Sequence, residues 1–134
     1  MSEPGADPAE SSRTIVPLLS VRGGAAAVAF YEAAFGAEVV FRIDDGGATF
    51  AQLVIEGAPF WLSDESPEHD NPGPVSLGGT TVRLILTVAD PVGAVARAVA
   101  AGGRPVTEVE EQNGWLSGRV ADPFGHHWEI GRPL

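Results

Sequence analysis

Cysteine and lysine are both absent from this chain of 134 residues. Without cysteine there is no disulfide, no thiolate nucleophile and no cysteine-bound metal. Without lysine there is no side-chain amine to form a Schiff base or to act as a general base. All eight basic residues are therefore arginine. These two absences exclude several common kinds of covalent and metal chemistry.

Positive charge is scarce as well. Eight basic residues stand against 18 acidic ones, which gives a formal net charge of −10. A nucleic-acid-binding protein needs a basic surface to displace counterions from phosphates, and an anionic membrane attracts basic clusters in the same way. We therefore expect neither nucleic acid nor a membrane as a partner.

Long apolar runs are missing too, and none approaches the roughly 18 residues that span a bilayer. The first 13 residues, MSEPGADPAESSR, are polar and acidic. They lack the basic-then-apolar order of a secretory signal, which favours a cytoplasmic location. Residues 1–12 show no apolar periodicity and are expected to be a disordered tail, and residues 13–134 to form a single domain.

The remaining chain contains the same order of predicted elements twice. Apolar alternation, helical spacing and turn residues predict a strand, a helix and three strands in each half. The predicted strands are 14–21, 38–43, 48–55 and 60–63, then 80–88, 104–110, 115–120 and 126–130, with helices at 25–35 and 92–101.

Two alignments support a repeat, since residues 31–37 resemble 97–103 and residues 56–62 resemble 124–130. Self-similarity at a half-chain period indicates two modules of one domain. The predicted fold is α+β, with βαβββ modules at about 14–63 and 80–131. Residues 64–79, rich in proline, glycine and acids, are expected to form a long connecting loop.

The segment near the C-terminus, ADPFGHHWEI at residues 121–130, carries the most chemistry. Its first half is typical of a turn, and its second half of a strand. Successive strand side chains point to opposite faces, so His127 and Glu129 share one face and Trp128 and Ile130 share the other. An imidazole beside a carboxylate can bind a metal or move protons.

Three motifs resemble the vicinal oxygen chelate superfamily, which includes glyoxalase I, bleomycin-resistance and fosfomycin-resistance proteins, and extradiol dioxygenases. They are FYEAAFGA at 30–37, VADP at 88–91 and DPFGHHWE at 122–129. The resemblance covers residues 14–131. It implies two βαβββ modules paired into a curved mixed sheet around a cleft, and often a homodimer.

Metal-using members of that superfamily place four ligands on the cleft face, usually His, Glu or Gln. Carried over by the repeat, those positions are Val16, Trp61, Arg83 and Glu129. Only Glu129 is a ligand type, and Arg83 brings a positive charge to where a metal would sit. We therefore predict no cofactor, with a divalent metal as the alternative.

Each candidate residue has a second interpretation. Glu129 is either a metal ligand or general base, or the ion-pair partner of Arg83, as charge compensation of a partly buried carboxylate favours. His127 either contributes to a metal site or only lines the cleft. Trp61 either stacks on a planar ligand or packs in the core. The acidic segment 64–70 either binds a cation or is a solvated loop over the cleft.

These features favour a small-molecule-binding protein of the glyoxalase/bleomycin-resistance type, which sequesters a toxic compound or antibiotic. Its candidate ligand-binding residues are Trp61, Arg83, His127 and Glu129. The alternative is a metal-dependent lyase, isomerase or dioxygenase that uses Glu129, with the metal completed by another chain or by water. A third class is a purely structural or regulatory dimer. No glycine-rich phosphate loop and no Gly-x-Ser-x-Gly elbow is present in the sequence.

Overall fold

The computed structural model describes residues 13–134. The tail expected at residues 1–12 lies outside the described residues. The first half contains β1 (Leu18–Val21), α2 (Gly24–Phe35), β2 (Glu38–Asp45), β3 (Ala48–Ile55) and β4 (Ala58–Asp64). The second half contains β5 (Arg83–Thr87), α4 (Pro91–Ala100), β6 (Arg104–Gln112), β7 (Trp115–Ala121) and β8 (His127–Pro133). The predicted order βαβββ is therefore present twice.

Each half folds into one four-stranded sheet, with strand orders β1-β4-β3-β2 and β5-β8-β7-β6. The pairs β1–β4 and β5–β8 are parallel, and the other neighbours are antiparallel. The register repeats as well, since Leu18 lies beside Trp61 in one sheet and Ile85 beside Glu129 in the other. The predicted α+β class with mixed sheets is confirmed.

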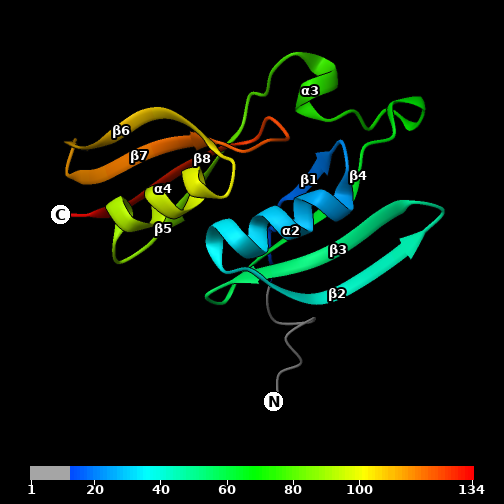
Figure 1. Ribbon diagram of the computed structural model, residues 1–134, viewed down its shortest axis with the longest axis horizontal. Coiled ribbons are helices and arrows are strands. Elements are labelled where there is room, and N and C mark those ends of the chain that lie inside the picture. Colours follow the sequence, from blue (N-terminus) through cyan, green and yellow to red (C-terminus); the bar gives the residue numbers. More distant parts are fainter. Residues whose placement is uncertain (1–12) are drawn as a thin grey trace.

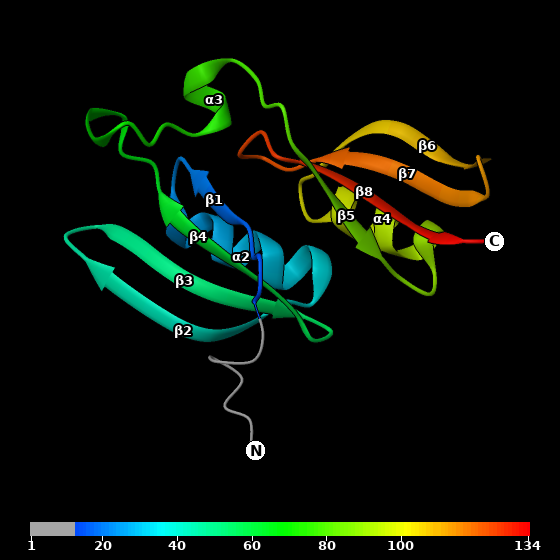
Figure 2. The same ribbon diagram turned by 180° about the vertical axis from the view of Figure 1, so that it is seen from behind.

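The two sheets lie side by side, and helices α2 and α4 cover the same side of both (Figures 1 and 2). The edge strands β1 and β5 are turned toward one another, as Figure 2 shows. We call the side of each sheet away from the helices its open face. Because strand side chains alternate, every second residue of a strand points to this face.

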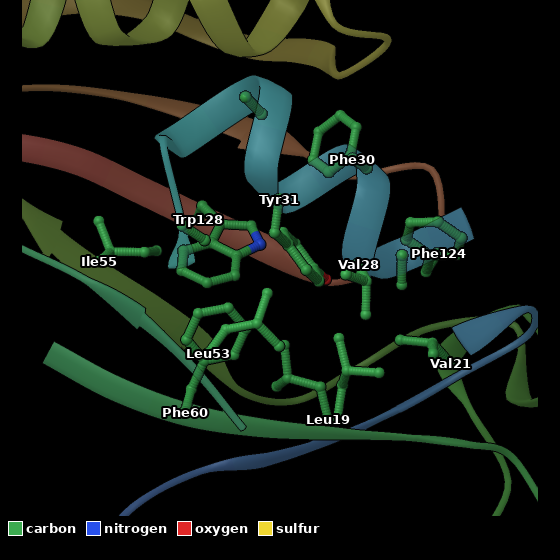
Figure 3. Close-up of a cluster of buried hydrophobic side chains, with 14 of the residues drawn as sticks. Leu19, Val21, Val28, Phe30, Tyr31, Leu53, Ile55, Phe60, Phe124 and Trp128 are labelled. Carbon is green, nitrogen blue, oxygen red and sulfur yellow. The ribbon is translucent and has the colours of Figure 1, made fainter. Parts of the chain in front are cut away.

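The core lies between the helices and the sheets, with Tyr31 at its centre (Figure 3). Tyr31 is fully buried, and its ring packs against the rings of Phe60 and Trp128 at centroid distances of 5.3 and 5.6 Å. Phe30 is buried beside it, and Phe35 is partly buried against the same cluster. The prediction that these three helix residues belong to the core is confirmed.

The ends of the two main helices follow from local sequence. Gly36 ends α2 in the left-handed conformation, with φ of 66°, and its N–H bonds the carbonyl of Glu32. Glycine is the residue that adopts this conformation without steric cost. Asp90 caps α4 by accepting a hydrogen bond from Gly93 N, and Pro91 occupies the first helical position. No helix within residues 13–134 is long and apolar enough to cross a membrane.

The structure differs from the sequence interpretation at two places. The first strand begins at Leu18, directly after Pro17, although residues 14–21 read as one β-rich run. The connecting segment also contains a 3₁₀ turn η1 (Pro67–His69) and a single helical turn α3 (Pro74–Leu77). Both short helices begin with a proline, whose fixed φ suits the first helical position.

The connecting segment is held in place by Glu65. Its carboxylate accepts hydrogen bonds from Arg22 Nε at 3.0 Å, Gly73 N at 2.9 Å and Ser76 Oγ at 2.7 Å. These three donors stabilise the ionised form and hold the pKa of Glu65 at about 2, well below its usual value. This carboxylate therefore ties α3 to the end of β1.

Candidate functional site

An ion pair on the open face of the second sheet joins Arg83 on β5 to Glu129 on β8. Arg83 Nη1 lies 3.4 Å from Glu129 Oε1. The two side chains point to the same face because Arg83 pairs with His127, two residues before Glu129. The ion pair predicted from charge compensation is therefore confirmed.

A second arginine, not foreseen from the sequence, holds the same carboxylate. Arg119 on β7 lies directly opposite Glu129 in the antiparallel register. Its Nε and Nη2 are each 3.1 Å from Glu129 Oε1. The alternation of residues 115–121 places Arg119 on the open face, but only the register between β7 and β8 brings it to Glu129.

The two arginines differ in how firmly they are held. The side chains of Arg119 and Glu129 are only 24% and 26% exposed, whereas that of Arg83 is 57% exposed. Arg119 also makes two contacts to the carboxylate and Arg83 makes one. Arg119 and Glu129 thus form a partly desolvated pair, and Arg83 is a more exposed cation beside it.

His127 shares the open face with Glu129, as predicted from strand alternation. Burial lowers the pKa of His127, and the positive charges of Arg119, Arg104 and Arg83 lower it further, while Asp122 opposes them. The imidazole is therefore mostly neutral near pH 7 and available to donate or accept a hydrogen bond.

The neighbouring histidine has a different position. His126 Nε2 lies 2.9 Å from the carbonyl oxygen of Ser20 on β1. This contact joins the turn before β8 to the first strand of the other half. His126 is therefore part of the junction between the modules and not of the open face.

Two hollows meet at the ion pair. One, of about 480 Å³, lies over the open face of the second sheet. It is lined by Thr81, Arg83, Ile85, Trp115, Ser117, Glu129 and Gly131. A smaller one, of about 300 Å³, is lined by Thr80, Thr81, Arg83, Arg119 and His127. Three of the four residues singled out from the sequence, namely Arg83, His127 and Glu129, are thus brought together.

Trp61 lies on the open face of the other sheet and lines neither of these hollows. It packs with Phe50 and Phe41, at ring centroid distances of 5.1 and 5.9 Å. Phe41 and Phe50 are 44% and 38% exposed, so the cluster faces outward and is not part of the core. Val16, at the equivalent position before β1, is partly buried and outside any regular element.

Among the described residues, no three side chains of His, Asp or Glu gather closely enough to hold a metal ion. In particular, the acidic segment that follows β4 forms no such group. Glu68 in that segment instead accepts a hydrogen bond from Ser66, which also contacts His69.

The chain thus repeats a βαβββ module, with an open sheet face in each half and a charged hollow on the second sheet. The chain belongs to the Glyoxalase/Bleomycin resistance protein/Dioxygenase superfamily, whose family model matches residues 14–130. The resemblance found in the sequence is thus confirmed.

Individual relatives agree with this assignment. An uncharacterized protein of Mycobacterium bovis is 42% identical over 124 residues, which covers 88% of this chain and 82% of that protein. A solved gene product of Arabidopsis thaliana is 31% identical, with a TM-score of 0.67 over 89% of this chain and 96% of that one. TioX from Micromonospora sp. ML1 is 25% identical, with a TM-score of 0.69 over 91% and 97% of the two chains.

Proposed function

We propose that this protein binds and sequesters a small apolar or aromatic compound on the open face of its second sheet. The observation that carries the proposal is the hollow of about 480 Å³ in which exposed Ile85 and Trp115 lie beside the Arg83–Glu129 pair. Its volume falls in the range of small-molecule sites, and a few polar groups on an apolar floor are typical of them. Because the superfamily includes bleomycin resistance proteins, we propose a toxic compound or antibiotic as the ligand.

The chemistry of the carboxylate supports binding without a divalent metal. Glu129 is the only ligand-type residue at the four family positions, and its Oε1 already faces two guanidinium groups. A divalent cation there would meet two positive charges, and among the described residues no group of three carboxylate or imidazole side chains is close enough to hold it. The residues present therefore do not fit the metal that the family often uses.

The direct test is a thermal-shift and calorimetric screen of bleomycin and planar aromatic drugs, carried out in EDTA. A ligand that binds the native state raises its melting temperature by mass action. Ile85→Ala should weaken the binding of any hit, since it removes apolar contact from the floor of the hollow. Val92→Ala is the matched control, because Val92 is also exposed but lies on α4.

The competing enzyme hypothesis is tested by metal analysis of the protein purified without EDTA. A metal retained at stoichiometric amounts, and lost in Glu129→Gln, would favour a metal-dependent lyase, isomerase or dioxygenase. A screen without any hit, together with no bound metal, would leave the structural or regulatory dimer as the remaining hypothesis.

We further propose that the chain works as a homodimer in the cytoplasm. Support for the dimer comes from the aromatic cluster of Phe41, Phe50 and Trp61, which is exposed on the open face of the first sheet. Contiguous exposed apolar surface of this kind marks interaction sites. Light scattering after gel filtration should give a dimer mass, and Phe41→Ser should lower it toward that of a monomer, whereas Val92→Ser should not.

A further inference from the structure

The positive charge around Glu129 exceeds what this carboxylate neutralises. Arg83 and Arg119 both point at Glu129 Oε1, so two cations share one anion. Arg104 is close enough to His127 to act on its titration together with the other two arginines. These arginines are gathered on one sheet of a chain whose net charge is −10.

The groups around the smaller hollow are the ones that recognise an oxyanion. Its lining consists of two guanidinium groups, one imidazole and the hydroxyl-bearing residues Thr80 and Thr81. Guanidinium groups bind carboxylate and phosphate through paired, charge-assisted hydrogen bonds. No carboxylate lines this hollow. Glu129 is outside this lining, and its Oε1 is contacted by both arginines, which holds the two guanidinium groups close together.

A further hollow at the ion pair has a different character. Arg83, Arg119 and Glu129 line this space, of about 350 Å³, together with Glu108 and Glu110 of β6. Three carboxylates around that space disfavour an anion. The charge distribution therefore selects the side of Thr80, Thr81 and His127.

The oxyanion hollow adjoins the apolar one. Thr81 and Arg83 line both, and Ile85 and Trp115 lie beyond them on the same sheet face. Ile85 is 72% exposed, so its side chain offers apolar surface to a ligand. A ligand with a charged head and an apolar body would occupy both spaces at once.

We propose that the ligand is an organic oxyanion: its head binds between Arg83 and Arg119 beside Thr80, Thr81 and His127, and its apolar body covers Ile85 and Trp115. This inference rests on the proposed function and specifies the ligand class of the same site. Arg83 is the recognition residue, since it is mostly exposed and held by one contact at 3.4 Å. Arg119 stays on Glu129 and supplies the fixed second charge.

A pair of probes that differ only in charge tests this inference. 2-Naphthoate is an anion at pH 7, and 2-naphthamide has nearly the same shape without the charge. Calorimetry should show naphthoate binding at least about tenfold more tightly than naphthamide, as expected for one charge-assisted contact. Sodium chloride should weaken the binding of naphthoate and leave that of naphthamide unchanged.

Variants locate the site. Arg83→Gln should reduce naphthoate affinity by about 10-fold to 100-fold and barely affect naphthamide. Arg42→Gln is the matched control, because Arg42 is an arginine on the other sheet whose guanidinium pairs with Asp44. Circular dichroism checks that each variant is folded. We expect both variants to fold, because substitutions at exposed positions change stability little.

Inorganic phosphate tests the head site alone, because it has no apolar body. Its binding is followed through the titration of His127. In the free protein, burial and the charges of Arg119, Arg104 and Arg83 lower the pKa of His127, whereas Asp122 raises it. An anion bound between Arg83 and Arg119 would offset the effect of the arginines. NMR titration should therefore show a higher pKa for His127 in saturating phosphate than in chloride. His69, in η1 of the connecting segment, serves as the reference and should not respond.

The outcomes separate this inference from the function on which it rests. Equal binding of naphthamide and naphthoate, with both weakened by Ile85→Ala, would overturn the anionic ligand class and leave a small-molecule site in place. No binding of naphthoate, with no response of His127 to phosphate, would overturn the inference regardless of the drug screen. A drug screen without hits would overturn the proposed function itself.

Discussion

Tyr31 donates its phenolic hydrogen to Asp122 Oδ2 at 2.5 Å, and this bond joins helix α2 of the first half to the turn before β8 of the second. Asp122 also accepts from Trp128 Nε1 at 2.9 Å and from the backbone N–H groups of Phe124 and His126. Asp122 is 5% exposed, so its oxygens depend on these four donors for their hydrogen bonds.

Asp122→Asn should destabilise the protein more than Tyr31→Phe does. Tyr31→Phe removes one donor and leaves three, with an expected cost of about 1–3 kcal/mol in the free energy of unfolding. In the asparagine variant the amide NH₂ has to face a donor, so at least one buried group loses its partner. Urea denaturation of both variants measures the order, and an equal cost for the two would contradict it.

The ionisation of Tyr31 should be coupled to unfolding at high pH. Burial and the neighbouring Asp122 carboxylate raise the pKa of Tyr31 well above its usual value. The folded state therefore holds this proton more tightly than the unfolded state, so stability is complete below about pH 10 and falls as the pH rises further. Because the chain has a single tyrosine, absorbance at 295 nm reports it directly. Tyrosinate absorbance that rises before circular dichroism shows unfolding would contradict the expectation.

Glu65 should make the protein sensitive to acid. Its folded pKa of about 2 lies below the usual value near 4.5, so the stabilisation is present above about pH 4.5 and is lost as the pH falls toward 2. Glu65→Gln should therefore lower the melting temperature at pH 7 and make little difference near pH 2. Glu38→Gln, at an exposed position at the start of β2, is the control and should show no such pH-dependent difference.

Gly131 allows β7 and β8 to approach closely beside the candidate site. A Cβ at this position would lie 2.6 Å from the carbonyl oxygen of Leu116 and 2.6 Å from Ser117 Cβ. Gly131→Ala should cost about 1–3 kcal/mol, as overpacking does. Gly79→Ala is the matched control, since nothing lies within 4 Å of the added methyl group. Thermal denaturation compares the two, and similar melting temperatures would contradict the close-packing argument.

Strand alternation was sufficient to predict the side on which each residue of β8 lies. His127 and Glu129 face outward and Trp128 and Ile130 face the core, because this depends only on the period of the strand. The Arg83–Glu129 pair followed from the repeat, since equivalent strands of the two halves have the same register.

Relations that depend on the pairing or packing of distant segments could not be read in the same way. Arg119 meets Glu129 through the register of β7 with β8. Trp61 has the predicted face but lies on the other sheet, away from Arg83, because the placement of one module against the other is a property of tertiary packing. Asp122 was recognised as a turn residue, while its bond to Tyr31 spans 91 residues.

The separation of the two sheets has a consequence for how such a fold can diversify. Strands β1 and β5 are edges of different sheets, so the halves are joined by helix packing and by side chains such as Tyr31, Asp122 and His126. Within residues 13–134 the two sheets share no backbone ladder, so side-chain packing in the shared core and these contacts hold the halves at their angle. Substitutions at that junction can change the orientation of one module relative to the other, while the backbone hydrogen bonds within each sheet are kept. Over evolutionary time, a single framework can in this way present binding surfaces of different width.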